Sequence, residues 1–241
     1  MRRSEVVSWA MYDFANSGYT TVVITAVFNA YFVAVVAGNA SWATFAWTAA
    51  LAVSYALIVV TAPLIGAYAD VRAAKKRLLL LTTVGCVVFT AGLAFVGRGD
   101  LALGIALVIL SNFFFGTGEN LIAAFLPELA RGEAMGRVSG WGWSLGYCGG
   151  LVALGACLAY VTHAQGRGAT ATEFVPVTML ITAALFAVAS LPTFIFIRER
   201  AQPGAVAGGV VSGAFARVAE TLGHARRHAD LWRFLVCVVF Y

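Results

Sequence analysis

Residues 44–77 read TFAWTAALAVSYALIVVTAPLIGAYADVRAAKKR, and this stretch decides the fold. Its first part, 44–67, has no charged side chain and exceeds the roughly 20 apolar residues that a helix needs to cross a bilayer core. Acidic and basic side chains then crowd into 70–77. An apolar run that ends in a basic cluster is typical of a transmembrane helix followed by a short loop.

The same pattern recurs along the 241 residues of the chain. Apolar runs occupy six segments and begin a seventh: 12–36, 44–67, 78–96, 101–125, 138–161, 175–197 and 231–241. Together they predict an all-α integral membrane protein with a six-helix transmembrane bundle at 1–197. They also predict a cytoplasmic linker with an amphipathic helix at 198–230 and the truncated start of a seventh transmembrane helix at 231–241.

The composition excludes several classes of protein. Hydrophobic residues make up 61% of the chain and charged residues 11%, against about 45–50% and about 25% in soluble domains. A soluble enzyme, a nucleic-acid-binding domain and a disordered regulator are therefore excluded. The net charge of +5 comes from clusters between apolar runs, as in membrane loops, so we expect the lipid bilayer and not nucleic acid as a partner.

The basic residues also predict the orientation. Of the 16 Lys and Arg residues, only Arg98 and Arg167 fall in the loops on one side of the predicted spans. The positive-inside rule therefore places the N-terminus in the cytoplasm. Because nearly all basic residues are arginine and Ala, Gly and Val are abundant, we expect a multi-pass protein of a bacterial inner membrane.

Charged side chains inside a membrane are costly and usually functional. Asp13 and Asn16 lie in the first predicted span, and Asn112, Glu119 and Asn120 lie in the fourth. Both acids fall in the cytoplasmic halves of their spans, where a carboxylate in a low-dielectric cavity can exchange a proton or pair with a cationic substrate. Two plainer interpretations stay open: Asp13 could cap its helix, and Glu119 could make a structural hydrogen bond between helices.

The fifth span is rich in glycine, with Gly142, Gly146 and Gly150 at four-residue spacing. This stripe predicts close packing against another helix. Trp143 and Tyr147 form an adjacent aromatic stripe that could line a cavity, pack in the core or face lipid.

A further group of residues lies between the second and third spans. Gly66 allows two helix ends to approach, and Asp70 can interact with the positive N-terminus of a neighbouring helix. With the basic residues Arg72, Lys75 and Lys76 it predicts a cytoplasmic gating loop, although a simple positive-inside loop would have the same charges. The chain has no phosphate-binding loop, His-Glu-x-x-His or Gly-x-Ser-x-Gly motif, so we expect no enzyme activity, cofactor or metal.

This loop resembles the signature of major facilitator superfamily transporters, although Ala73 stands where that signature has glycine and the first basic residue comes one place late. The segments 9–17 (WAMYDFANS), 125–129 (FLPEL) and 142–150 (GWSLGYCGG) are similar to the vacuole-effluxer-like branch, related to autophagy-linked amino-acid exporters. The resemblance implies the N-terminal half of a transporter with two six-helix bundles, each made of two inverted three-helix repeats. A C-terminal bundle would then be missing, and the first and fourth spans would line the central cavity.

These observations lead to one main hypothesis and several alternatives. The main hypothesis is a secondary active transporter that moves amino acids or similar small polar solutes by alternating access. It would use no cofactor, and protons are the candidate coupling ion. Glu119 would be the proton or substrate carboxylate, Asn16 and Asn112 would hydrogen-bond the substrate, and Asp70 with Arg72 would form a latch. The alternatives are a membrane scaffold or receptor on the same fold, an exporter of drugs or other metabolites, and a half-transporter that dimerises.

Overall fold

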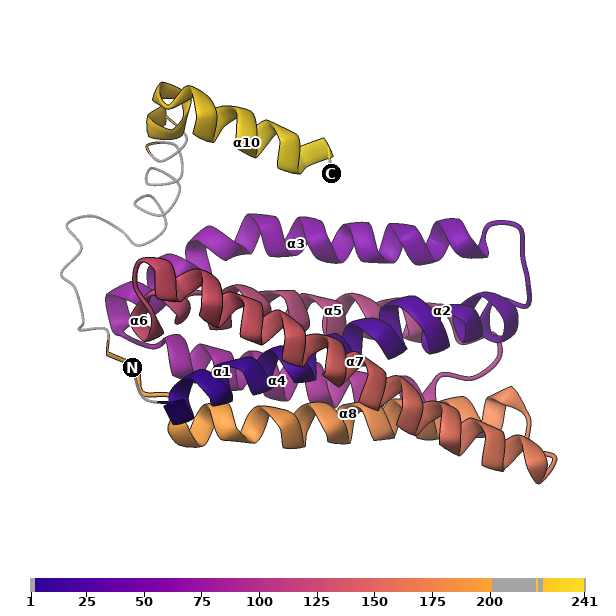
Figure 1. The fold of residues 1–241 in the computed structure, drawn as a ribbon. Coiled ribbons are helices and arrows are strands. Elements are labelled where there is room, and N and C mark those ends of the chain that lie inside the picture. The colour runs from indigo at the N-terminus through magenta and orange to yellow at the C-terminus, as the bar shows by residue number, and fades with distance from the viewer. Residues whose placement is uncertain (1–2, 201–219, 221–222, 241) are drawn as a thin grey trace. The chain divides into compact units, whose positions relative to one another are not determined.

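A computed structural model describes residues 3–200, 220 and 223–240, and the regular elements in this part of the chain are helices (Figure 1). Six helical segments are long and apolar enough to cross a membrane: Arg3–Val36, Ala43–Arg72, Lys75–Phe95, Leu101–Leu129, Ala134–Gly166 and Ala171–Phe196. The predicted all-α membrane fold is confirmed. The predicted amphipathic helix of the linker falls mostly on residues 201–219 and 221–222, which lie outside the described residues.

The first span is not a uniform α-helix. It comprises α1 (Arg3–Tyr19), a π-helical stretch η1 (Thr20–Ala26), α2 (Val27–Tyr31) and a second π-helical stretch η2 (Phe32–Val36). The sequence of η1, TTVVITA, is mostly β-branched, and such side chains crowd the turns of an α-helix. The Thr25 hydroxyl donates to the carbonyl of Thr20, five residues back, at 3.1 Å. The wider turn begins four residues after Asn16, and π-helical turns are frequent at functional sites.

The remaining spans are longer than the apolar runs that predicted them. Their elements are α3 (Ala43–Arg72), α4 (Lys75–Gly92) with a 3₁₀ turn η3 (Leu93–Phe95), α5 (Leu101–Ala123), a short α6 (Leu126–Leu129), α7 (Glu133–Gly166) and α8 (Ala171–Phe196). A further helix, α10 (Ala229–Phe240), coincides with the predicted seventh apolar run.

The chain's contacts divide it into two units, Met1–Ile58 with Lys75–Arg200 and Val59–Ala74 with Ala201–Tyr241. Within the first unit, α1 packs extensively against α7 and α8, and α4 packs against α5 and α8. If the helices α1, α3 and α4 repeat as α5, α7 and α8, then the α1–α8 contact corresponds to the α5–α4 contact. The α4–α8 contact corresponds to itself. These two contacts agree with two three-helix repeats, whereas the extensive α1–α7 contact has no comparable counterpart between α5 and α3 among the described residues.

Glycine brings α1 and α7 into direct contact. A Cβ atom on Gly149 would overlap with the backbone carbonyl of Phe14, and one on Gly142 would lie 2.5 Å from the Trp9 ring. A Cβ on Gly146 would lie 2.9 Å from a carboxylate oxygen of Asp13. The glycine stripe of the fifth span therefore faces α1, and backbone packs on backbone along this seam.

Aromatic side chains, by contrast, separate α1 from α5. The Trp9 indole donates to the carbonyl of Ile122 at 2.9 Å, and the Tyr19 hydroxyl lies 2.9 Å from the hydroxyl of Ser111. The Tyr19 ring also stacks on Phe115, with 4.7 Å between centroids. These large side chains hold the two helices apart, so space remains beside the α1–α7 seam.

The connection between the second and third spans differs from the predicted loop. The helix α3 continues to Arg72, so Gly66 and Asp70 are helical, and only two residues separate α3 from α4. The turn closes with Ala73 at φ +47° and a hydrogen bond of 3.0 Å from the Ala74 amide to the Ala69 carbonyl. The apolar run ended early because charges, which mark the membrane boundary, appear before the helix stops.

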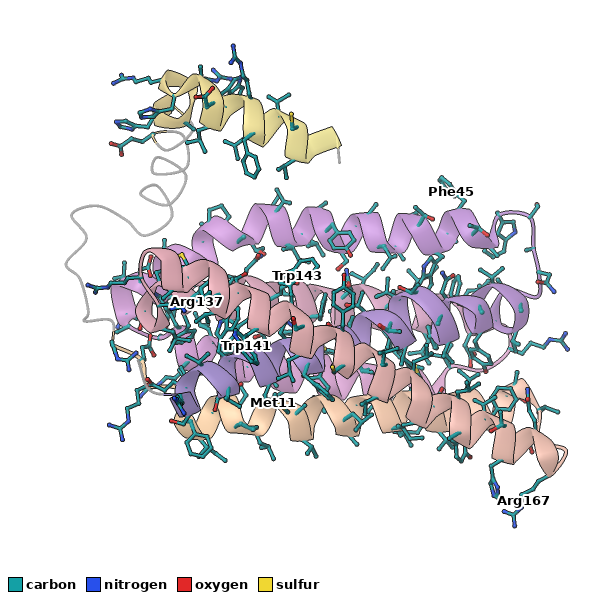
Figure 2. The ribbon with its side chains drawn as sticks, in the orientation of Figure 1. Met11, Phe45, Arg137, Trp141, Trp143 and Arg167 are labelled. Atoms are coloured by element: carbon teal, nitrogen blue, oxygen red, sulfur yellow. The ribbon has the colours of Figure 1, made fainter. Side chains whose placement is uncertain are left out.

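Much of the surface of the first unit is apolar, as expected of helices in lipid. Phe45 on α3 is 76% exposed and is seen at the surface in Figure 2. Phe95, Val188 and Ile195 are exposed in the same way. In water such a surface would be unfavourable, whereas the hydrocarbon of a bilayer covers it.

Candidate functional site

A polar cavity of about 290 Å³ lies beside the α1–α7 seam, where α1 and α5 stand apart. Its lining comes from α1, η1, α5 and α7: Asp13, Asn16, Ser17, Thr20, Thr21, Phe115, Glu119, Tyr147, Gly150, Leu151 and Leu154. Four of the residues singled out from the sequence, Asp13, Asn16, Glu119 and Tyr147, are thus brought together. Their functional roles remain predictions.

Asn16 is the most constrained polar group of this cavity. Its residue is only 3% exposed, and neither its amide nitrogen nor its amide oxygen has a hydrogen-bond partner in the described part of the chain. Buried side-chain amides are nearly always hydrogen-bonded, and leaving one unpaired costs roughly 1–3 kcal/mol. A solute with both donor and acceptor groups would satisfy this amide.

Two carboxylates line the same cavity as Asn16. Asp13 is partly buried in the interior of α1, ten residues after the helix begins at Arg3, so it does not cap the helix. Glu119 on α5 is exposed. Among the described residues, neither carboxylate has a hydrogen-bond or ion-pair partner, so the structural hydrogen bond considered for Glu119 is not seen. Two acids without basic partners make the cavity attractive to a cationic group.

Three other predicted residues lie outside the lining of this cavity. Asn112 is fully buried on α5 and donates to the Ser54 hydroxyl on α3 at 3.1 Å, while its oxygen has no partner among the described residues. Asn120 is exposed on α5. Trp143 is 66% exposed and lies 6.1 Å from the ring of Tyr147, between centroids.

Sequence reasoning missed Ser17, Thr21 and Phe115 as lining residues. The two hydroxyl residues follow Asp13 by four and eight positions, a helical spacing that places them on one side of the helix. That spacing was a usable signal. Phe115 gave none, because an aromatic residue in an apolar span is ordinary.

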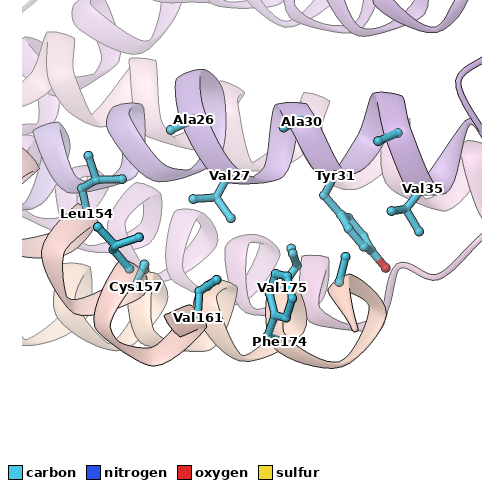
Figure 3. A pocket seen from close by; sticks show the side chains of 13 residues that line it. Ala26, Val27, Ala30, Tyr31, Val35, Leu154, Cys157, Val161, Phe174 and Val175 are labelled. Carbon is cyan, nitrogen blue, oxygen red and sulfur yellow. The ribbon is translucent and has the colours of Figure 1, made fainter. Parts of the chain in front are cut away.

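A second pocket, of about 340 Å³, lies among α2, η2, α7 and α8 and is almost wholly apolar (Figure 3). Its side chains are mainly Ala, Val, Leu and Phe. The hydroxyl of Tyr31, on its lining, already donates to the carbonyl of Val96 at 3.0 Å. The pocket therefore offers few groups to a polar solute.

An ionic cluster joins helix ends on the side where α1 begins. Its residues are Glu5, Lys75, Lys76, Glu128, Glu199 and Arg200. The Glu199 carboxylate accepts hydrogen bonds from the backbone amides of Lys75 at 2.6 Å and Lys76 at 3.2 Å, so it caps the N-terminus of α4. A negative charge is favourable at this end of a helix.

Arg200 connects this cap to α1. Its guanidinium donates to both carboxylate oxygens of Glu5, at 2.7 and 2.8 Å, and its backbone amide donates to Glu128 at 3.3 Å. The ammonium of Lys75 pairs with Glu128 at 3.2 Å. The cluster thus ties the ends of α1, α4, α6 and α8. Sequence reasoning placed Lys75 and Lys76 in a gating loop and did not identify their acidic partners, which lie far away in sequence.

No set of three metal-ligating side chains gathers among the residues that the structure describes. The two exposed cysteines, Cys148 and Cys237, and the two buried ones, Cys86 and Cys157, are all free thiols.

Six membrane-length helices and a polar cavity lined by three of them are the features of a multi-pass membrane protein with room for a solute. The chain belongs to the vacuole effluxer Atg22-like family, whose model matches residues 29–136 and 133–241. This transporter family is not enzymatic, in agreement with the missing enzyme motifs.

The chain is also similar to an uncharacterized MFS-type transporter, YxiO, of Bacillus subtilis (strain 168). The two are 27% identical over an alignment of 249 residues, gaps included, and the alignment covers 97% of this chain and 56% of the relative. The chain thus spans about half the length of this curated relative. No solved structure matches it.

Proposed function

We propose that the chain forms the N-terminal half of a secondary transporter that moves amino acids or similar small polar solutes out of the cytoplasm. A second six-helix bundle would complete the site, and the two bundles would rock around it in alternating access. Export rests on similarity to a family described as vacuole effluxers. The N-terminus would lie in the cytoplasm of a bacterium.

The observation that carries this proposal is the unpaired, buried amide of Asn16 in a cavity that two carboxylates also line. The ammonium group of an amino acid would pair with Asp13 or Glu119. The amide of Asn16 can donate to a carboxylate and accept from an ammonium group. The apolar Leu151 and Leu154 would contact an aliphatic side chain.

Glu119 is proposed as the group that couples transport to protons. It is the more open of the two acids, and among the described residues no cation neutralises it. When the solute leaves, a proton can take the place of its cationic group. Asp70 and Arg72 on α3 are proposed as a latch to the second bundle, and Asn112, Asn120 and Trp143 as residues that this bundle would bring to the pathway.

Uptake into inverted membrane vesicles tests the proposal. Vesicles that contain the full-length protein are given a mixture of ¹⁴C-labelled amino acids, with and without an imposed pH gradient. We expect accumulation that Asp13→Asn and Glu119→Gln each lower by at least about tenfold, a loss of about 1.4 kcal/mol of transition-state stabilisation. The control Asp230→Asn removes a fully exposed carboxylate of α10 and should retain uptake.

The outcomes separate the parts of the proposal. Unchanged uptake and unchanged pH dependence in Glu119→Gln would remove its coupling role. If the wild-type vesicles accumulate none of the labelled amino acids, the substrate class is wrong. If Glu119→Gln loses only the pH dependence of uptake while Asp13→Asn loses uptake itself, Glu119 carries the proton and Asp13 binds the solute.

A further inference from the structure

A third pocket, of about 710 Å³, lies on the opposite side of the α1–α7 seam from the polar cavity. Trp141 lines this pocket, whereas Tyr147, next to Trp143, lines the cavity. Figure 2 shows Trp141 and Trp143 on opposite sides of α7. The third pocket is therefore separate from the proposed solute pathway.

The lining of this pocket is charged at one end and mainly apolar along the rest. Arg3 on α1 and Arg137 on α7 provide the charge, and no carboxylate is among the lining side chains that the structure describes. The apolar part follows one stripe on each helix, Val6, Val7 and Ala10 on α1 and Val138, Trp141 and Leu145 on α7. Val7 is 58% exposed and Trp141 is 72% exposed, so the groove is open on its outer side.

Two helix starts add to the positive charge. The helix α1 begins at Arg3 and α7 begins at Glu133, at the same end of the bundle (Figure 1). The first backbone amides of a helix have no intrahelical partner and favour an anion. Arg3 and Arg137 are both exposed, and neither has an ion pair among the side chains that the structure describes.

We propose that this pocket binds an anionic phospholipid of the leaflet on the side where α1 begins. The lipid phosphate lies between the guanidinium groups of Arg3 and Arg137, and an acyl chain follows the apolar stripe past Val7 and Leu145. The stripe on α1 from residue 3 to residue 10 extends about 10 Å, which matches the upper part of an acyl chain. Trp141 lies at the headgroup level, where tryptophan is enriched.

The chemistry of the groove selects a lipid over a soluble anion. Inorganic phosphate would contact the arginines and leave the apolar stripe uncovered. A zwitterionic lipid would cover the stripe, but its headgroup cation would oppose the two arginines. Basic pockets between transmembrane helices are known sites for anionic headgroups.

The test is a titration of the purified full-length protein in neutral maltoside detergent with dioctanoyl phosphatidylglycerol, followed by melting temperature. We expect a saturable rise for the wild type, and no rise with dioctanoyl phosphatidylcholine or with inorganic phosphate. The variant Arg3→Gln/Arg137→Gln should weaken the binding by roughly thirtyfold, the effect of two basic residues at an anionic lipid surface. Arg167→Gln, which removes an exposed arginine at the other end of α7, is the matched control and should bind as the wild type does.

A second variant keeps the test independent of charge. Val7→Trp fills the apolar groove from an exposed position and should weaken phosphatidylglycerol binding with both arginines present.

Equal binding by the wild type and Arg3→Gln/Arg137→Gln would overturn the proposal. An equal response to inorganic phosphate would replace the lipid by a simple anion. No response of the wild type would also overturn the proposal. Because the readout is lipid binding, none of these results depends on transport.

Discussion

Ala73 adopts a backbone conformation that L-amino acids rarely take. Its φ of +47° lies in the left-handed region, which costs a residue with a Cβ atom roughly 1–2 kcal/mol. The similarity to transporter signatures led us to expect glycine here, and the structure supplies the reason for that expectation.

Replacing Ala73 by glycine should therefore stabilise the protein. After the greater entropy of glycine in the unfolded chain is subtracted, we expect Ala73→Gly to raise the free energy of unfolding by about 0.5–1 kcal/mol. The measurement is unfolding by dodecyl sulfate in mixed micelles, followed by circular dichroism. Ala74→Gly, at the next position, should lower the same free energy. A loss of stability in Ala73→Gly would contradict the strain that we infer.

Single residues also show how far sequence reasoning reaches into the site. Asp13 and Glu119 stood out because charge in an apolar run is costly, and both line one cavity. Asn112 shares a helix face with Glu119 by its spacing, yet it lies two turns away and contacts Ser54. Helical periodicity gives the face of a residue but does not say which neighbouring helix covers that face at each depth.

The seam between α1 and α7 depends on the absence of side chains. Gly149→Ala would place a methyl group against the backbone of Phe14, and a backbone cannot rotate aside as a side chain can. We expect a loss of about 1–3 kcal/mol in the free energy of unfolding, the usual cost of overpacking. Gly155→Ala, on the same helix with open space around its Cβ position, is the matched control and should be neutral or slightly stabilising.

If Gly149→Ala and Gly155→Ala have the same free energy of unfolding in the mixed-micelle assay, the inferred close approach of α1 and α7 is wrong. Reduced stability of Gly149→Ala alone would support it.

For the helices, the sequence predicted which ones exist but not their full length. The fifth span was expected at 138–161, whereas α7 runs over Glu133–Gly166. Hydropathy reports where lipid ends, and a helix continues into the headgroup region as long as its backbone can bond to itself. The π-helical turns of the first span were not predicted, because a β-branched run in an apolar segment is compatible with several helical forms.

The orientation of the whole molecule is a prediction from the distribution of basic residues. It places the connection 167–170, between α7 and α8, outside the cell, and the turn at 130–132, between α6 and α7, in the cytoplasm. In a bacterial host, alkaline phosphatase fused after Gly168 should be active and a fluorescent protein fused after Arg131 should fluoresce. As a control, the two reporters are exchanged, and both should then be silent. The reverse result would invert the topology.

The ionic cluster at the end of the bundle marks the limit of sequence reasoning for the whole molecule. Glu5 and Arg200 form its tightest pair, and they lie at opposite ends of the bundle sequence. Each of the six spans can be recognised separately, because each must be long and apolar enough to cross the bilayer. A pair such as Glu5 and Arg200 depends on how all six spans assemble, and a single sequence holds no local signal for it.

Two kinds of contact set the distances between the helices around the cavity: glycine packing between α1 and α7, and aromatic packing between α1 and α5. Glycine has no side chain that could change its rotamer, so backbone contact fixes the distance between α1 and α7. The rings of Trp9, Tyr19 and Phe115 fill the space between α1 and α5, so the separation of these two helices depends on the size of these side chains. The size of these three side chains therefore sets the width of the cavity. Substitutions at these three positions should change the size of the solute that the cavity accepts.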